Sequence, residues 1–278
     1  MKIRLAKSAG FCFGVKRAID IALKTAASGH PIQMLGDIVH NEDVIRMIEK
    51  AGIKKLRSLA PGTNKTLLIR AHGAPLSTFK KAQRLGYSLV DATCPMVKEI
   101  HKIAKTMEQK GYSIIIIGDK KHDEVHGIIG QLKRSAIVID DLRGIPLRKI
   151  SKIKKSAVVV QSTQNLEKIL EIVKVLKSRI PEFKFFNTIC GPTRLNQIEI
   201  KSLPVVNVVA IVIGSKKSAN TKRLFEISKA LNQRSYWIQS EKNLKRRWFI
   251  NASSVGVTAG ASTPDSTTKK VIARLKQF

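Results

Sequence analysis

The chain contains three cysteines, separated by 82 and 96 residues: Cys12, Cys94 and Cys190. An odd number of thiols cannot pair completely within one chain, and cytosolic thiols stay reduced. Each cysteine ends a strand-like stretch and precedes a helix-like one, with a basic residue four positions later: Lys16, Lys98 and Arg194. A helix N-terminus and a nearby cation both favour the thiolate, which is the form that binds metals. This shared setting predicts one metal or cluster site rather than three unrelated buried thiols.

Polar residues in turns recur at matched distances from the cysteines. Twenty-eight residues after each cysteine lie, in order, His40, His122 and Ser218. A looser set follows other strand-like runs and comprises His72, Ser162 with Thr163, and Ser262. Single residues of these kinds are more often helix caps or structural turns. Their repetition, together with Asn220, predicts hydrogen-bond donors around an anion at the carboxyl ends of parallel strands.

One acidic residue stands out in this pattern. Glu124 belongs to the segment His122-Asp123-Glu124, which follows a strand-like run ending at Gly118. A carboxyl group in a closed anion site can hold a proton and deliver it to substrate. A carboxylate placed at a helix start by the helix dipole is the other interpretation, and the sequence alone favours neither.

The spacing of the cysteines bears on which metal they bind. Zinc sites usually use closely spaced cysteine pairs, and this chain has none. Iron–sulfur clusters usually take four cysteine ligands, so a cubane on three would leave one iron without a protein ligand. That iron could bind substrate while the cluster supplies electrons. The spacing favours a cluster over zinc and leaves both possible.

Continuous apolar runs alternate with amphipathic segments along the chain. We expect strands at residues 66–70, 114–118, 157–160 and 208–214, and helices at 15–27, 97–109 and 166–179. Met1–Leu5 predicts a further strand. This alternation predicts an α/β fold with parallel sheets, divided into three α/β domains. Their boundaries are residues 13–94, 95–190, and 191–278 together with 1–12.

The composition limits the class of protein. The 278 residues carry a net charge of +31, and 43% are apolar, enough for a substantial core. The basic residues are spread along the chain and aromatic residues are only 5%, so we do not expect a nucleic-acid partner. No apolar stretch reaches 18 residues, and the N-terminus lacks the apolar segment of a signal peptide. We therefore expect a soluble cytoplasmic protein without membrane contact.

Several segments, taken in order, resemble those of one enzyme family. They are Gly10-Phe11-Cys12-Phe13-Gly14-Val15, Val39-His40-Asn41, Ala71-His72-Gly73, Asp91-Ala92-Thr93-Cys94-Pro95, His122-Asp123-Glu124-Val125, Gln161-Ser162-Thr163, Gly214-Ser215-Lys216-Lys217-Ser218-Ala219-Asn220 and Val257-Thr258-Ala259-Gly260-Ala261-Ser262. From Ile3 to about Leu275 the chain is similar to the 4-hydroxy-3-methylbut-2-enyl diphosphate reductases, the last enzymes of the methylerythritol phosphate route to isoprenoids.

The resemblance implies three pseudo-threefold related α/β domains in a trefoil around a central cavity. It implies one 4Fe–4S cluster on Cys12, Cys94 and Cys190, whose open iron binds the substrate hydroxyl. The reaction would be reductive dehydroxylation of the allylic diphosphate to isopentenyl and dimethylallyl diphosphate. The electron donor would be a flavodoxin or a ferredoxin.

The resemblance also assigns roles to the polar residues. Those that would bind substrate are His40, His72, His122, Ser162, Ser218, Ala219, Asn220 and Ser262. Those that would act in catalysis are Glu124, as proton donor, with Ser162 and Thr163 in the proton relay.

Four positions depart from the family pattern. Ser162 replaces a usual Thr but keeps the hydroxyl, and Ala219 replaces a common Ser and so lacks a phosphate donor. Lys217 stands in place of Asn, and Asn196 in place of Arg. Two rivals remain open: a cluster-dependent hydro-lyase that consumes no electrons, and a nucleic-acid-binding protein with a structural metal, suggested by the +31 charge.

Overall fold

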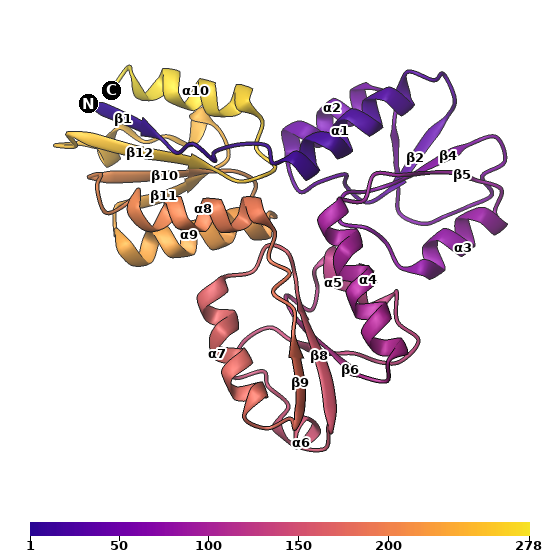
Figure 1. Ribbon diagram of the computed structural model, residues 1–278. Coiled ribbons are helices and arrows are strands. Elements are labelled where there is room, and N and C mark those ends of the chain that lie inside the picture. Colours follow the sequence, from indigo (N-terminus) through magenta and orange to yellow (C-terminus); the bar gives the residue numbers. More distant parts are fainter. The chain divides into compact units, whose positions relative to one another are not determined.

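The computed structural model describes all 278 residues and contains three four-stranded sheets in which every strand pair is parallel (Figure 1). The first sheet has the order β3 (Lys54–Leu56), β2 (Ile32–Leu35), β4 (Thr66–Ile69) and β5 (Ser88–Asp91). The helices in this part of the chain are α1 (Phe13–Ala26), α2 (Glu42–Lys50) and α3 (Leu76–Arg84).

The second sheet has the order β7 (Ile137–Ile139), β6 (Ser113–Ile117), β8 (Lys155–Val160) and β9 (Glu182–Phe185). Its helices are α4 (Pro95–Gln109), α5 (Asp123–Ile129), α6 (Leu147–Ile150) and α7 (Leu166–Lys177). The third sheet has the order β1 (Lys2–Leu5), β12 (Ser254–Ala259), β10 (Val209–Ile213) and β11 (Ser235–Ile238). Its helices are α8 (Gly191–Ser202), α9 (Ala219–Leu231) and α10 (Asp265–Leu275), with short 3-10 turns η1 (Glu241–Asn243) and η2 (Arg246–Phe249).

All three sheets share one connectivity. In each, the first strand after the cysteine pairs with the second and the third, and the third also pairs with the fourth. In the third sheet the fourth strand is β1, which comes from the N-terminus. The α/β class with three parallel-sheet repeats is therefore confirmed, and residues 2–5 form a strand of the third sheet.

The chain folds into two compact units. Unit 1 comprises Met1–Lys16, Val39–Met47 and Gly191–Phe278, and it contains the third sheet. Unit 2 comprises Arg17–Ile38 and Ile48–Cys190, and it contains the first and second sheets. The domain boundaries at residues 94 and 190 stay a prediction.

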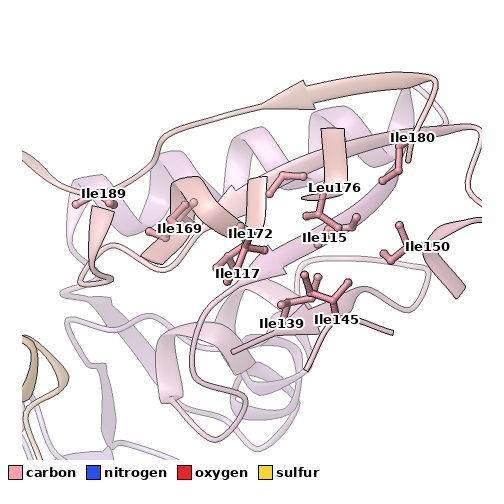
Figure 2. Packing of buried hydrophobic residues seen from close by; sticks show 12 residues of the cluster. Ile115, Ile117, Ile139, Ile145, Ile150, Ile169, Ile172, Leu176, Ile180 and Ile189 are labelled. Carbon is pink, nitrogen blue, oxygen red and sulfur yellow. The ribbon is translucent and has the colours of Figure 1, made fainter. Parts of the chain in front are cut away.

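The second sheet shows why continuous apolar runs form these strands. Ile115 and Ile117 of β6 pack on one face with Ile169 and Ile172 of α7, in the isoleucine-rich cluster of Figure 2. The alternate residues of β6 and β8 pack on the other face with α4 and α5: Ile114, Ile116, Ala157 and Val159. Because successive side chains point to opposite faces, a strand covered on both sides is apolar along most of its length.

The third sheet is covered on both faces in the same way. Ile211 and Ile213 of β10 pack with Val271 of α10, whereas Val212 packs with Leu224 of α9. Figure 1 shows α10 and α9 on opposite faces of this sheet. The expected strands and helices are found, with ends that differ by at most two residues. The structure has no helix with the length and apolar character needed to cross a membrane.

Candidate functional site

Each cysteine lies immediately before a helix, as the sequence predicts. Cys12 precedes α1, Cys94 is the N-cap of α4, and Cys190 precedes α8. In unit 1, the Cys12 sulfur accepts a hydrogen bond from Val15 N–H at 3.5 Å, so this thiol serves as a helix cap. All three cysteines are partly exposed.

The backbone holds the three cysteines in the same way. Within unit 2, Cys94 N–H donates to Ala71 O at 3.0 Å, and Cys190 N–H donates to Ser162 O at 3.1 Å. Within unit 1, Cys12 N–H donates to Ala261 O at 3.1 Å. Each acceptor directly precedes a residue of the looser polar set, in order His72, Thr163 and Ser262. The repeat read from the sequence is thus a repeat of hydrogen-bonded geometry.

Glu124 and Ser162 form a buried pair in unit 2. Glu124 lies in the first turn of α5 and is only 2% exposed. Its two carboxyl oxygens accept hydrogen bonds from Ser162, one from the backbone N–H at 2.6 Å and one from the hydroxyl at 2.8 Å. Thr163 Oγ1 accepts a hydrogen bond from Gln161 at 3.2 Å. The serine hydroxyl therefore lies where it can pass a proton to or from the carboxyl group.

Burial raises the pKa of the Glu124 carboxyl to about 7, and it outweighs the two hydrogen bonds from Ser162 that act to lower the pKa. A charged carboxylate loses hydration energy on burial, which favours the neutral acid. The carboxyl lies in the first turn of a helix, where the dipole favours the carboxylate, yet burial raises its pKa to about 7, so a proton-carrying form is populated near neutral pH.

The raised pKa predicts a pH-dependent stability. In the unfolded chain Glu124 ionises near its ordinary pKa of 4.5, whereas in the folded protein it keeps its proton up to about pH 7. The group therefore lowers the free energy of unfolding as pH rises through this window, by up to about 3 kcal/mol. The free energy of unfolding should be measured with denaturant at pH 4 and at pH 8 for Glu124→Gln and for the protein without the substitution. Relative to that protein, the variant should be more stable at pH 8 than at pH 4. An equal difference at both pH values would contradict the burial argument.

Two histidines of unit 2 lie beside this pair. His122 is the N-cap of α5, and its Nδ1 accepts the Glu124 backbone N–H at 3.1 Å. An accepting Nδ1 carries no hydrogen, so a neutral His122 has its hydrogen on Nε2. The rings of His72 and His122 meet edge to face, with centroids 5.4 Å apart. Unit 2 thus gathers His72, His122, Glu124, Ser162 and Thr163.

Unit 1 gathers the other predicted substrate-binding residues. Ser262 Oγ donates to His40 O at 3.4 Å, so these two segments are in contact. Ser218 is the N-cap of α9 and accepts the Thr221 N–H at 3.3 Å, which leaves its own hydroxyl hydrogen available as a donor. Ala219 is the first residue of α9 and, without a hydroxyl, offers only its backbone N–H.

Asn220 has the least satisfied side chain of this set. It is 5% exposed, and neither its amide oxygen nor its amide nitrogen has a hydrogen-bond partner. Buried side-chain polar atoms are nearly always paired, because an unpaired amide loses its hydrogen bonds to water. Both atoms of Asn220 are therefore available for a bound polar molecule at the start of α9.

Close backbone packing sets the turns around Asn220. A Cβ atom on Gly214 would lie 2.6 Å from Thr221 Oγ1, and one on Gly260 only 2.0 Å from it. Trp237 holds the same turn, because its ring N–H donates to Gly214 O at 2.9 Å. The Nζ of Lys216 lies 4.0 Å from the Trp237 ring centroid. The two turns that carry Ser218 and Ser262 are thus packed around one threonine.

Some supporting contacts were not foreseen from the sequence. In unit 2, Arg70 Nη1 lies 2.6 Å from Asp123 Oδ2, so the residue after β4 is bound to the residue before Glu124. Neither residue type suggests a partner 53 positions away. Asn196, the departure from Arg, is 2% exposed and has specific partners in unit 1 that are described below.

Known proteins resemble this chain along nearly its whole length. The model of the family described as LytB protein matches residues 3–276. The chain is 41% identical to the 4-hydroxy-3-methylbut-2-enyl diphosphate reductase of Campylobacter hominis over 99% of this chain and 98% of the relative. It is 38% identical to the reductase of the same description from Geotalea uraniireducens, over 100% and 98%.

Two solved structures are also similar to the chain. One is described as (E)-4-hydroxy-3-methyl-but-2-enyl diphosphate reductase, the terminal enzyme of the non-mevalonate pathway; it is 35% identical, with a TM-score of 0.74 and full coverage of both chains. The other, a diphosphate reductase from Plasmodium falciparum, is 27% identical, with a TM-score of 0.91 over 99% of this chain and 88% of that one. The chain therefore belongs to the LytB protein family.

Proposed function

We propose that this protein catalyses the reaction for which its relatives are named, the reductive dehydroxylation of 4-hydroxy-3-methylbut-2-enyl diphosphate. The observation that carries the proposal is Glu124, a buried carboxyl with a pKa of about 7 that is hydrogen-bonded to the Ser162 hydroxyl. A neutral acid of this kind can protonate a leaving hydroxyl group near physiological pH.

The three cysteines fit one 4Fe–4S cluster by the chemistry of the donor set. Each is a partly exposed thiol directly before a helix, and each is held by an equivalent backbone hydrogen bond. Cys12, Cys94 and Cys190 would hold the cluster. When bound, such a cluster supplies electrons and an iron without a protein ligand that acts as a Lewis acid.

The substrate-binding role rests on donors that the fold leaves available. The Asn220 amide and the Ser218 hydroxyl lie at the start of α9, where backbone N–H groups and the helix dipole favour an anion. His40 and Ser262 belong to the same unit. In unit 2 the ring of His122 lies edge to face with the ring of His72, with centroids 5.4 Å apart. We propose that these residues and His72 bind the diphosphate.

The reaction balances with two electrons and two protons. The allylic C–O bond breaks, and the oxygen leaves as water after taking a proton from Glu124. The second proton forms a C–H bond at either end of the allylic unit, which yields isopentenyl or dimethylallyl diphosphate. Ser162, hydrogen-bonded to the carboxyl, is placed to return a proton to Glu124.

The anaerobic absorption and spin-resonance spectra test the proposal. We expect the purified protein to show a cluster signal that changes when the diphosphate is added, and two electrons of reduced donor to be consumed per product. A hydro-lyase would turn over without consuming donor. A protein with no cluster signal, or with a signal that substrate leaves unchanged, would contradict the proposal.

We also propose that the electron donor is a small acidic protein of the flavodoxin or ferredoxin kind. The net charge of +31 would attract such a partner. Raising the ionic strength from about 50 to about 500 mM should then slow reduction by the protein donor about tenfold. A small dye carries few charges, so its rate should change much less. Equal salt responses for both donors would count against the charge argument.

The basic surface does not require a nucleic-acid partner, and none is proposed. An oligonucleotide that binds at physiological salt would reopen that alternative, because such binding depends steeply on salt.

A further inference from the structure

The segments that lead into Cys94 and Cys190 share a local device. Asp91, three residues before Cys94, accepts the Thr93 N–H at 2.9 Å and also the Thr93 hydroxyl. Asn187, three residues before Cys190, accepts the Ile189 N–H at 3.3 Å. Each is a turn in which a side-chain oxygen holds the backbone of the residue just before the cysteine.

The segment that leads into Cys12 lacks this device. The residue three positions before Cys12 is Ala9, which has no side-chain acceptor. Gly10 follows with a φ of +107°, a conformation open to glycine but rarely to other residues. A Cβ atom at this position would also lie 2.8 Å from the Asp265 carboxylate. The backbone here is held by hydrogen bonds from Ala9 N–H to Ala6 O and from Gly10 N–H to Ala259 O, but neither residue offers a side chain that could hold the turn before Cys12.

Two residues of helix α8 bind the segment that leads into Cys12, although they lie far from it along the chain. Glu199 accepts the Lys7 N–H at 3.0 Å, the Ser8 N–H at 2.8 Å and the Ser8 hydroxyl. Asn196, with its amide nitrogen facing these acceptors, donates to Ser8 Oγ at 2.7 Å, to Ser8 O at 3.1 Å and to Pro192 O at 3.2 Å. Every polar group of Ser8 is thus bonded to α8, four residues before Cys12.

The negative charge of Glu199 strengthens its hydrogen bonds from Lys7 and Ser8. Burial alone would raise the pKa of Glu199, but the hydrogen bonds from Ser8 and Lys7 outweigh it and leave the pKa below its ordinary value. Glu199 is therefore ionised at physiological pH, and hydrogen bonds to an ionised acceptor are stronger than those between neutral groups. All of these contacts lie within unit 1.

We propose that Glu199 and Asn196 are positioning residues for Cys12, and that they replace the side-chain turn that orders the segments before Cys94 and Cys190. By holding Ser8 on α8, they fix the start of the short loop whose other end is bound through Cys12 N–H to Ala261 O. The tie keeps the thiol oriented as a cluster ligand, so the inference rests on the proposed function. It also gives Asn196, the departure from the family pattern, a structural role.

The test uses the full-length, iron-loaded protein under anaerobic conditions. Two rates are measured for Glu199→Ala and Ser8→Ala: backbone hydrogen exchange in peptides covering residues 6–12, and release of iron to a ferrous chelator. The matched control is Glu226→Ala on α9, whose carboxylate pairs with Lys222 and Arg223 near the surface of the same unit.

We expect Glu199→Ala to release iron about tenfold faster, the lower end of what the loss of a ligand-orienting contact costs in metal affinity. Exchange should rise in residues 6–12 and stay unchanged in peptides covering 91–94 and 187–190. Ser8→Ala should change both rates in the same direction by less, and the control should change neither.

Iron release at the normal rate in Glu199→Ala would overturn the positioning role, even if exchange in the loop rises. If hydrogen exchange in residues 6–12 stays unchanged, the hydrogen bonds of Glu199 do not order this segment, and the proposal is overturned. If Glu199→Ala fails to fold, Glu199→Gln keeps the shape while removing the charge, and the same two rates decide. A normally folded, unsubstituted protein that never holds iron would instead overturn the proposed function.

Discussion

Replacing Glu124 by glutamine is expected to lower turnover by about a hundredfold or more while iron content stays unchanged. Glutamine keeps the shape of the side chain, and its amide oxygen can still accept one of the two Ser162 hydrogen bonds while its amide nitrogen can donate to the Ser162 hydroxyl, but it has no acidic proton to give. General acid catalysis typically contributes about 10²–10⁴-fold to rate, so the loss should fall in that range. Steady-state turnover and iron analysis on the same preparation measure the two quantities together.

The pH profile separates loss of a proton donor from loss of structure. Because the acid acts in its protonated form, turnover of the unchanged protein should fall as pH rises through about 7. In Glu124→Gln this decline should be absent. Turnover should be measured with a small reductant whose potential does not depend on pH. The pH dependence of the electron donor then does not contribute to the pH profile of turnover.

Glu108→Gln is the matched control, because it removes another buried carboxylate of unit 2. Glu108 accepts the Lys133 N–H at 3.0 Å and the Arg134 N–H at 2.7 Å, so its role is to cap a turn. It should affect stability and leave turnover near normal. Near-normal turnover of Glu124→Gln, or an equal loss in both variants, would remove Glu124 from the proposed mechanism.

Replacing any one of Cys12, Cys94 and Cys190 by serine is expected to deplete the protein of iron. Contacts that merely orient a ligand are worth about 10–100-fold in metal affinity, and loss of the ligand itself should cost at least about 100-fold. Thiolate is the ligand that iron–sulfur clusters use, and a serine hydroxyl is not ionised near neutral pH. Iron and sulfide analysis after anaerobic purification gives the result directly.

Met96→Leu is the control for this series. Met96 lies two residues from Cys94 and is 46% exposed, so the change removes a sulfur atom near the site without removing a thiol. Far-ultraviolet circular dichroism should show that the serine variants keep their helices and strands. Iron content that stays normal in all three serine variants would rule out the cysteines as ligands.

The fold was predictable to the extent that local patterns decide it. The apolar runs at 114–118 and 208–214 became β6 and β10 because strands buried on both faces cannot carry polar side chains. Helix starts after the cysteines were also predictable. The shorter strands, such as β3 with the residues Lys54, Lys55 and Leu56, carry no such signal. They form because a neighbouring strand offers hydrogen bonds.

The repeat indicates candidate site residues, but it does not indicate the environment of each side chain. The position thirty residues after each cysteine holds Glu42, Glu124 and Asn220 in turn. Glu42 accepts the Ser215 hydroxyl at 3.0 Å, Glu124 is a buried acid, and Asn220 has both amide atoms unpaired. The equivalent position in the three repeats therefore has a different environment in each. Neither spacing nor residue type distinguishes them, because the difference lies in what packs around each side chain.

The sequence by itself determined the three α/β repeats, the cysteine before a helix in each, and the polar turns that follow at matched distances. Those features depend on burial and helix-start patterns over a few residues, so they can be read along the chain. Only the tertiary structure decided that the pKa of Glu124 is raised by burial, that Asn220 is left with unpaired atoms, and that Glu199 holds Ser8 across 191 positions. Desolvation and side-chain hydrogen bonds depend on neighbours in space, and the folded chain alone brings those neighbours together.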